Sequence, residues 1–554
     1  MRKSLLFTAF SFAAIAAGAQ TVTIQDGDLV GGQTYNWTAD TEYLLDGFVF
    51  LEADGVLNIA PGTVIKAMET PSTSDNASAL IITRGAQIFA EGTQAEPIIF
   101  TSELDDVTDN SDLDETDNGL WGGLVILGNG NIASSAPEGN IEGIPTSEPR
   151  GFYGGTDDND NSGVVQYVSI RHGGAALSTG NEINGLTLGA VGSQTVIENV
   201  EVFANFDDGI EWFGGTANCK WCITAFCGDD AFDFDEGWRG KGQFWLTVQR
   251  SDSGDNGGEH DGANPDGATP FSNPTIYNAT YIGSGIGATA GNATALLFRD
   301  ATGGTYANSI FTEYANHGIE VEDLPAASGV DSRQRMEDGD LVLANNIWWE
   351  FGAGNTLDTA GFIRATADAD DEAADFLITH LAGNNNSVED PQLISISRAA
   401  DGMLRPFPEA GSPAWSNLAD LPAGDAFYTD VNYRGAFGSE NWAAGWTALS
   451  AYGYIGDPTG INNQTPVYST AFPVVPNPAS TQATVRFQTE VAGSVELRMF
   501  DLSGRLVYDL SSTQQVSAGE HMINLQVADL AEGIYHYELI VANERHVGRI
   551  SIVR

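Results

Sequence analysis

Acidic residues gather between positions 205 and 261, and part of this set recurs 22 residues further along the chain. The pair Asp207–Asp208 is followed by the pair Asp229–Asp230. If these pairs stack in adjacent layers, their carboxylates repel one another unless a cation or a shared proton relieves them. Ca²⁺ suits such a cluster because it takes about six to eight oxygen ligands from flexible loops. The predicted metal ligands here are Asp207, Asp208, Asp229, Asp230, Asp233 and Asp235.

Two other interpretations of this cluster stay open. In the first, the aspartate side chains cap backbone amides in turns and bind no ligand. In the second, the aspartates catalyse a reaction together with a histidine and an arginine that follow them in the chain. The catalytic candidates are Asp208, Asp229, Asp230, His260 and Arg299.

The order of these candidates is similar to that in polygalacturonases, which are β-helix hydrolases that cleave acidic glycans with inversion. The resemblance implies that Asp229 or Asp230 is the general acid and that Asp208 helps to activate water. It also implies that Arg299 holds a substrate carboxylate. Inversion requires the two carboxyl groups to stand about 6.5–9.5 Å apart. The chain has no Gly-His-Gly motif, and no Arg-x-Lys motif follows at the place expected for those enzymes.

Other acidic loops carry oxygen-bearing side chains at alternate positions, a second pattern typical of Ca²⁺ sites. A DDNDNSG segment contains the predicted ligands Asp157, Asn159 and Asn161, although it lacks the closing glutamate of an EF-hand loop. The segments 105–117 and 252–258 are similar in composition. Each of these loops can also be a solvated turn. Their recurrence in one chain favours Ca²⁺ as the cofactor.

The charge balance excludes several kinds of partner. The chain has 23 basic and 75 acidic residues, which gives a net charge of −52. A surface this negative repels nucleic acid and anionic membranes. The chain is nevertheless a folded one, because 42% of its residues are hydrophobic, 18% are charged and 65 are glycines. The composition therefore predicts a turn-rich fold that binds no nucleic acid.

A repeat of 22 to 23 residues indicates how the acidic residues are positioned. Such a unit holds about three short strands and three turns, so it can close on itself as one coil of a three-sided solenoid. We expect Ile210 to stack on Phe232 inside the coils, and Trp212 to stack on Phe234. Glu211 lies between them in the sequence, so alternation predicts that it faces solvent.

Two further pairs of segments have the same spacing. The segments 62–66 and 85–89 are 23 residues apart, as are 296–298 and 319–321. We therefore expect each pair to stack in adjacent coils.

The segments 79–102 and 120–126 carry a resemblance to a known fold. Their apolar runs, separated by Gly-Ala and Glu-Gly turns, resemble the opening coils of right-handed parallel β-helix proteins of the pectate-lyase-like class. The resemblance implies an all-β chain in which a right-handed parallel β-helix solenoid is followed by a small C-terminal β-sandwich. Residues 340–460 resemble the last coils and closing cap of such proteins, with one short helix at 371–381.

The N-terminus has the features of an export signal. Arg2 and Lys3 precede an apolar run, and Ala17-Gly18-Ala19 offers a cleavage site, so residues 1–19 are predicted to be a signal peptide. No later stretch reaches the roughly 20 apolar residues of a membrane helix, so we predict no transmembrane segment.

Export places the cysteines in an oxidising compartment. Cys219, Cys222 and Cys227 are the three cysteines of the chain. One local disulfide and one buried thiol are expected, and the pairing stays open at this point.

The C-terminal part resembles the type A sorting domain of type IX secretion. The resemblance rests on the segments 472–478, 497–507, 533–537 and 549–554. It implies passage through the periplasm, export across the outer membrane, and partners in the type IX secretion machinery and its sorting protease. The predicted domains are a β-helix at 20–455, a linker at 456–470 and the sorting domain at 471–554. The residues that carry the sorting motif are Pro476, Asn477, Pro478, Gly504, Gly533 and Tyr535.

Two functions are consistent with these patterns. The first is a secreted or surface-bound adhesin or glycan-binding scaffold that Ca²⁺ stabilises. The second is a polysaccharide-degrading enzyme, either a hydrolase or a lyase, on the same fold. An extracellular polysaccharide is the expected partner in both cases, and fold alone does not choose between them.

Overall fold

The computed structural model describes residues 20–177, 182–289, 294–325, 329–366, 373–458, 469–471, 474–489, 493–500, 505–528, 530–541 and 544–554. The chain divides into two compact units, Met1–Thr459 and Gly460–Arg554. The predicted signal peptide at 1–19, Gly504 and most of the predicted linker lie outside the described residues.

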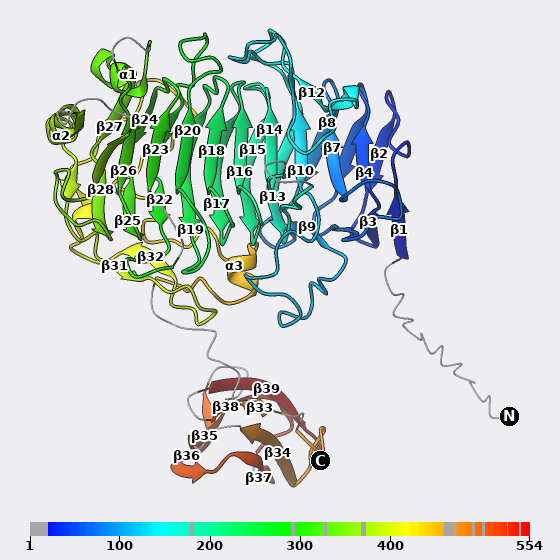
Figure 1. Ribbon diagram of the computed structural model, residues 1–554. Coiled ribbons are helices and arrows are strands. Elements are labelled where there is room, and N and C mark those ends of the chain that lie inside the picture. Colours follow the sequence, from blue (N-terminus) through cyan, green and yellow to red (C-terminus); the bar gives the residue numbers. More distant parts are fainter. Residues whose placement is uncertain are drawn as a thin grey trace. The chain divides into compact units, whose positions relative to one another are not determined.

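The first unit is a stack of coils built from parallel strands (Figure 1). One side of the coils is a ten-stranded sheet in which every strand pairs with its counterpart in the next coil. This arrangement is the predicted parallel β-helix. The strands of this sheet are β4 (Phe48–Leu51), β7 (Ala79–Ile82), β10 (Leu124–Leu127), β14 (Leu186–Gly189), β16 (Ile210–Phe213), β18 (Phe232–Asp235), β20 (Gly258–Asp261), β23 (Leu296–Arg299), β26 (Ile319–Glu322) and β29 (Ile363–Thr366).

The other two sides form one 18-stranded sheet, because its longest strands turn a corner without a break. The residue at that corner has a positive φ in consecutive coils, for example Asn199 at 54° and Trp221 at 55°. The strands of this sheet are β1 (Gln20–Ile24), β2 (Thr34–Trp37), β3 (Thr41–Leu45), β5 (Val56–Ile59), β6 (Val64–Ala67), β8 (Gln87–Glu91), β9 (Ile98–Ser102), β13 (Gly163–Arg171), β15 (Val196–Phe203), β17 (Asn218–Ala225), β19 (Lys241–Val248), β21 (Thr275–Tyr277), β22 (Thr280–Ile282), β24 (Gly304–Ala307), β25 (Ile310–Tyr314), β27 (Leu341–Ala344), β28 (Ile347–Phe351) and β30 (Ser387–Val388).

The register of the middle coils is the one that the repeat predicts. Ile210 pairs with Phe232 and Trp212 with Phe234. In the later coils, β23 pairs with β26 in the predicted register. Stacking brings the rings of the lumen together, and Trp212 lies 5.2 Å from Trp245 between ring centroids. All five side chains are fully buried, so they form part of the apolar core of the coils.

One predicted pair of stacked segments is wrong. The segments 62–66 and 85–89 do not stack, because β6 pairs with β9 while β8 pairs with β5. Val56 of β5 lies opposite Gln87, a separation of 31 residues. The residues between β6 and β7 lengthen this coil beyond the common repeat, so equal spacing in the sequence does not mean equal position in the coil.

The last coil is closed by helices. α1 (Ser332–Asp338) and α2 (Ala373–Gly383) contact the final strands, and Leu377 and Leu381 of α2 are fully buried in the core. The helix predicted at 371–381 is thus present, and its first two residues lie outside the described part of the chain.

The segments expected to form the closing cap take a different path. We call residues 389–458 the strap, because they run back along the outside of the 18-stranded sheet (Figure 1). Lys220 Nζ donates to the carbonyl of Phe427 at 2.6 Å, and Gln94 donates to the carbonyl of Ala444 at 2.8 Å. The outer face of this sheet carries apolar side chains that the strap covers. The strap contains β31 (Leu393–Ser395), β32 (Arg405–Pro408), the 3-10 turn η2 (Pro413–Trp415) and α3 (Ala448–Ala451).

The second unit consists of two small antiparallel sheets that share one core. Alternate residues of its strands face this core, since Val485, Phe487, Leu497 and Met499 are all buried. The strands are β33 (Ser469–Ala471), β34 (Gln482–Thr489) and β37 (Gly519–Gln526) in one sheet, and β35 (Gly493–Phe500), β36 (Leu506–Val516), β38 (Gly533–Val541) and β39 (Glu544–Ile552) in the other.

Two of the cysteines form a local disulfide. Cys219 and Cys222 are bonded, while Cys227 is a buried free thiol. Burial raises the pKa of the Cys227 thiol, which keeps it protonated and unreactive. The expectation of one disulfide and one buried thiol is therefore confirmed.

Candidate functional site

The two acidic pairs of the sequence repeat lie in successive coils, and Asp255–Asn256 occupies the corresponding turn of the coil beyond. Each pair lies in the turn that precedes a strand of the ten-stranded sheet. Asp208 Oδ1 accepts the backbone N–H of Asp230 at 2.9 Å, and Asp230 Oδ1 accepts that of Asn256 in the coil beyond. These bonds fix one carboxylate directly above the next. The turns therefore stack as regularly as the strands that follow them.

Eight carboxylates converge along these turns and the adjoining strands. Their ligand oxygens form four overlapping groups of three, and within each group the oxygens lie within 4.8 Å of one another. We call this set the acidic ladder. Its members are Asp207, Asp208, Glu211, Asp229, Asp230, Asp233, Asp255 and Glu259.

The ladder is an unfavourable arrangement without a counterion. Burial, and then repulsion from neighbouring carboxylates, raises the pKa of Asp207 to about 7. The pKa values of Asp208, Asp230 and Asp233 are raised well above their ordinary range for the same two reasons. Burial also raises the pKa of Glu259 to about 7, despite an arginine nearby. At neutral pH these groups must share protons or bind cations.

Basic partners are scarce at the ladder. In the described part of the chain, Arg299 is the only cation that forms an ion pair with a ladder member, namely Glu259. Arg299 also contacts Asp261 at 2.6 Å, so its guanidinium is already engaged. One oxygen of Asp233, Oδ1, is buried and has no hydrogen-bond partner among the described residues. Among the described residues, the carboxylates of the ladder other than Glu259 thus have no basic side chain that forms an ion pair with them.

Sequence reasoning missed three members of the ladder. Glu211 was expected to face solvent, but it is only 6% exposed because the ladder and the Asn184 amide cover it. Asp255 and Glu259 were absent from the predicted ligands. The register contains the missing signal, since Glu211, Asp233 and Glu259 occupy the same position in three stacked strands.

His260 is not part of the site. Its side chain points into the lumen, where it is fully buried and stacks on Phe234 with 4.0 Å between ring centroids. Its Nε2 is hydrogen-bonded to the Tyr306 hydroxyl at 2.9 Å. Burial lowers the pKa of His260 to about 3, so the ring is neutral. The predicted catalytic role of His260 is therefore wrong, because strand alternation turns it away from the carboxylates.

Two other predicted ligand sets lie apart from the ladder. Asp235 belongs to none of the acidic groups found among the described residues, although burial raises its pKa to about 6. Asp157 Oδ1 accepts the N–H of Asn159 at 3.0 Å, and Asn161 Oδ1 accepts that of Gly163 at 2.9 Å. These side chains accept backbone N–H groups of turns within their own loop.

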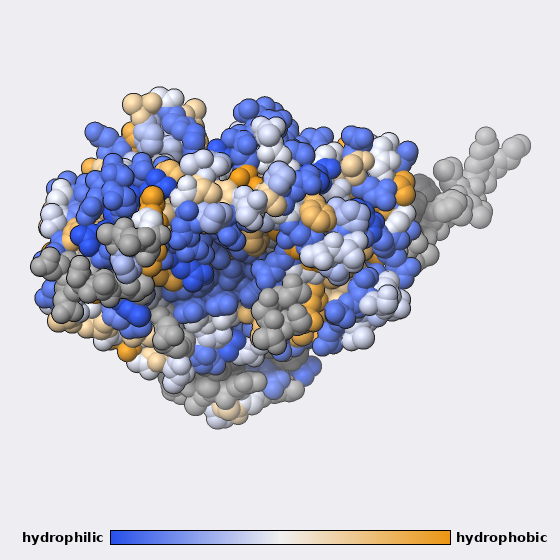
Figure 2. Space-filling model, turned by 45° about the horizontal axis from the view of Figure 1, so that its top comes forward, coloured by the Kyte–Doolittle hydropathy of each residue, from blue (hydrophilic) through white to orange (hydrophobic). Residues whose placement is uncertain are grey.

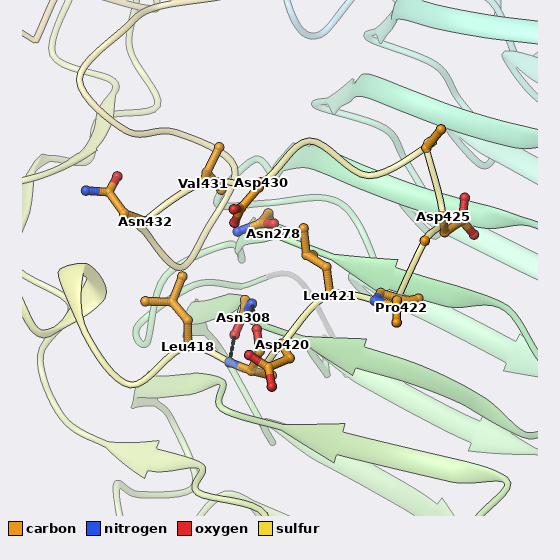
Figure 3. Close-up of a pocket in the computed structure, with 14 residues that line it drawn as sticks. Asn278, Asn308, Leu418, Asp420, Leu421, Pro422, Asp425, Asp430, Val431 and Asn432 are labelled. Carbon is orange, nitrogen blue, oxygen red and sulfur yellow. Dashed lines mark hydrogen bonds between the residues drawn. The ribbon is translucent and has the colours of Figure 1, made fainter.

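Figure 2 shows hydrophilic side chains gathered in a hollow in the middle of the β-helix, between patches of mixed character. A separate pocket of ≈ 830 Å³ lies between the strap and the 18-stranded sheet. There Asn308 accepts the backbone N–H of Ala419 at 2.7 Å (Figure 3). The Asn278 amide donates to the carbonyl of Tyr433. Asn278 and Asn308 therefore hold the strap against the sheet through hydrogen bonds.

The coils of parallel strands and the closing helices define a parallel β-helix. The family model described as pectate-lyase like beta helix domain matches residues 31–391, and the chain belongs to this family. A second model, the secretion system C-terminal sorting domain, matches residues 473–553. No curated protein matches the chain.

One solved structure with partial similarity is the enzymatically active domain of tailspike protein 2 from bacteriophage CBA120. It is 9% identical, the match covers 92% of this chain and 72% of that chain, and the TM-score is 0.28. A TM-score this low supports no inference about this chain.

The sorting domain determines where the protein goes. It marks the chain for export by type IX secretion to the cell surface or the extracellular space, and it implies contact with the secretion machinery. Of its predicted motif residues, Asn477 accepts the N–H of Ser551 at 2.9 Å, and Tyr535 donates to the carbonyl of Ala531 at 2.9 Å. Gly533 begins β38 with a φ of 154°. Pro476 and Pro478 flank Asn477.

In the described ranges, no helix has the length and apolar character needed to cross a membrane.

Proposed function

We propose that the protein is a glycan-binding scaffold of the cell surface whose acidic ladder holds Ca²⁺. The observation that carries this proposal is the convergence of eight largely unpaired carboxylates in register across successive coils. Carboxylate oxygens are the preferred ligands of Ca²⁺, and the overlapping groups of three offer more than one place for an ion. Each bound ion would replace carboxylate repulsion by attraction and would tie one coil to the next.

The proposal accounts for the position of the ladder. Asp208 and Asp230 use one oxygen each to hold the turn of the next coil, which leaves their second oxygens for a ligand. Asp233 has the unpartnered Oδ1 at the centre. A purely structural role in capping turns explains the first set of oxygens and leaves the second set unexplained.

The experiment is thermal unfolding of residues 20–458 with Ca²⁺ and with chelator. A ligand that binds only the folded state stabilises it by about 2.7 kcal/mol at a concentration 100-fold above Kd, so we expect chelation to lower the midpoint clearly. The double variant Asp208→Asn/Asp230→Asn should lose this response. The matched control is Asp390→Asn/Asp401→Asn, which removes two charges from exposed positions of the strap and should keep it. An unchanged response in the ladder variant would refute the site.

A degrading enzyme is the second candidate, because carboxyl groups with a pKa near neutrality, such as Glu259, can act as general acids. The positions of two of the five predicted catalytic residues argue against an enzyme, because His260 lies in the lumen and Arg299 is engaged by two carboxylates. Release of reducing ends or unsaturated products from acidic and neutral polysaccharides would favour the enzyme. Binding without product release would favour the scaffold.

A further inference from the structure

A pocket of ≈ 690 Å³ adjoins the acidic ladder and has walls of two kinds. One kind is aromatic and the other is acidic. It lies between the ten-stranded sheet and the insertion that joins β10 to β13, which contains β11 (Gly139–Asn140), the 3-10 turn η1 (Pro149–Gly151) and β12 (Phe152–Tyr153). The aromatic members of its lining are Phe48, Tyr153 and Phe213, and the acidic ones are Asp75, Glu142, Asp235 and Glu236.

The aromatic wall is rigid. The Tyr153 hydroxyl donates to Glu236 Oε2 at 2.7 Å, and the Tyr153 ring lies 5.8 Å from that of Phe213 between centroids. Tyr153 is 2% exposed and Phe48 is 7% exposed, whereas Phe213 is half-buried and presents the open ring. Such fixed rings suit a ligand with a flat apolar face, because no side-chain freedom is lost when it binds.

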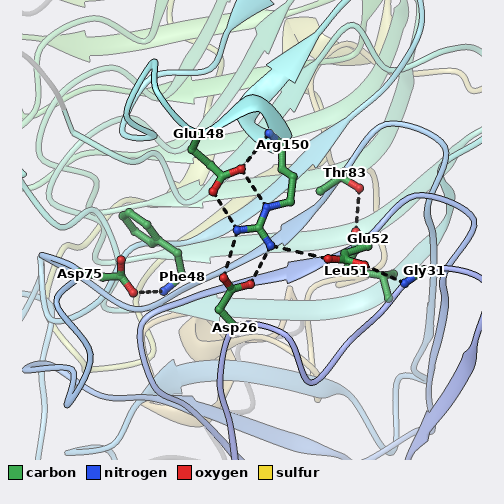
Figure 4. Close-up of polar contacts among 9 residues, drawn as sticks. All are labelled: Asp26, Gly31, Phe48, Leu51, Glu52, Asp75, Thr83, Glu148 and Arg150. Atoms are coloured by element: carbon green, nitrogen blue, oxygen red, sulfur yellow. Dashed lines mark hydrogen bonds and ion pairs between the residues drawn. The ribbon is translucent and has the colours of Figure 1, made fainter.

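The insertion that supplies Tyr153 is fastened to the first coils by Arg150 (Figure 4). Its guanidinium donates to Asp26 at 2.8 and 3.0 Å and to Glu148 at 2.8 Å, and it lies 4.0 Å above the centroid of the Phe50 ring. Glu52, a further acidic neighbour of Arg150, accepts the N–H of Gly31. The pocket is therefore formed before any ligand arrives.

The pocket is acidic, and Arg299, the cation whose charge acts on Asp235, lies outside its lining. None of the described residues that line it is a lysine or an arginine. Burial and repulsion from Glu182 raise the pKa of Glu142, and burial raises the pKa of Glu236. Burial also raises the pKa of Asp235 to about 6. A cation in the pocket would relieve all three carboxylates at once.

We propose that this pocket binds an amino sugar, through its ammonium group and its apolar ring face. A metal ion would satisfy the carboxylates and leave the aromatic wall unused, while a neutral sugar would leave the carboxylates unpaired. An ammonium-bearing pyranose satisfies both, since its C–H face packs on Phe213 and its charge lies beside Asp235 and Glu236. The volume is within the range of about 300–1,000 Å³ that is typical of small-molecule pockets. The assignment rests on the proposed glycan-binding function and names its ligand class.

The test is calorimetric titration of residues 20–458, in saturating Ca²⁺, with a short glucosamine oligomer and with its fully N-acetylated counterpart. We expect binding of the glucosamine oligomer only. Phe213→Ala and Asp235→Asn should each weaken it about tenfold or more, and the effect of Phe213→Ala separates the ring contact from simple charge attraction. The matched control Asp420→Asn, which lines the pocket beneath the strap, should bind normally.

The possible outcomes distinguish a failure of the pocket assignment from a failure of the proposed Ca²⁺ site at the ladder. If neither oligomer binds while the Ca²⁺ response of unfolding is intact, the pocket assignment fails and the metal site stands. Equal affinity for the N-acetylated oligomer would remove the role of the ammonium group. Equal affinity for a trilysine peptide would overturn the sugar assignment in favour of amines in general. If the unfolding of the parent protein did not respond to Ca²⁺ while the glucosamine oligomer bound normally, the metal site at the ladder would be refuted and the pocket assignment would stand.

Discussion

The acidic ladder and the acidic loops are made of the same residue types but have opposite environments. In the loop at 105–117, Asp109 Oδ1 accepts the N–H of Ser111 at 3.1 Å and its hydroxyl at 2.6 Å. In the loop at 157–163, Asp157 caps the turn in the same way. These carboxylates are exposed, and their own turns satisfy them. In the ladder, by contrast, stacking of the coils holds carboxylates against one another and buries Asp208, Asp230 and Glu211, while Asp229 stays exposed.

Local composition therefore does not decide whether aspartates form a ligand site. A loop carboxylate can turn to the nearest backbone amide or to water, so its oxygens already accept hydrogen bonds and need no cation. A ladder carboxylate is held by the parallel register and has its neighbours fixed about one strand spacing away. Only the second arrangement stores electrostatic repulsion that a cation can release.

The largest expected effect is a pH dependence of the metal-free protein. The pKa values of Asp207 and Glu259 are raised to about 7 in the folded state, so the folded state binds more protons than the unfolded one above pH 4. Stability must then fall as pH rises from about 4 through 7. In chelator we expect the unfolding midpoint to fall across this window, and in Ca²⁺ we expect it to stay nearly level. A midpoint in chelator that rises with pH would contradict the description of the ladder.

The sequence predicts part of the acidic ladder. The repeat correctly places Asp207–Asp208 beside Asp229–Asp230, because a strict period fixes the register. It does not reveal that Glu211 is covered, since burial depends on Asn184 and on neighbouring coils far apart in sequence. It also cannot place His260, which follows a loop of irregular length before β20.

The strap shows a second limit of sequence reasoning. Its apolar residues indicate that it packs somewhere, and an end cap is the simplest place. The actual surface is the outer face of the 18-stranded sheet, where Phe203, Ile223 and Leu246 would otherwise be exposed. The sequence of those strands looks like a buried run on both faces, which is also what an ordinary parallel sheet shows. Long-range packing of this kind has no local signature.

A smaller effect is expected from one charge in the middle of the ladder. Asp233→Asn keeps the shape of the side chain and removes a carboxylate whose Oδ1 has no partner among the described residues. In chelator the variant should be more stable than the parent by on the order of 1 kcal/mol, because folding no longer has to bury or protonate that carboxylate. In Ca²⁺ it should be less stable, because a ligand is lost. Unfolding curves in both conditions test this change of sign. If the midpoint of the variant shifted in the same direction with chelator and with Ca²⁺, Asp233 would not be a Ca²⁺ ligand, and the ladder would not differ from the loops in this respect.

The smallest effect is expected in the loops. Asp157→Asn keeps an oxygen that can accept the N–H of Asn159, so the free energy of unfolding should change by less than about 0.5 kcal/mol, and the Ca²⁺ response should be unaltered. Asp157→Ala removes the cap and should cost about 0.5–1 kcal/mol equally with and without Ca²⁺. Asp157→Asn removes only the charge of the side chain, whereas Asp157→Ala removes the hydrogen-bond acceptor as well, so the two variants distinguish these contributions. If Asp157→Asn lowered the Ca²⁺ response and Asp157→Ala lowered it no further, the loop would bind the ion through its charge. The distinction between stacked and solvated carboxylates would then fail at its weakest point, because an exposed turn would bind as the buried ladder does.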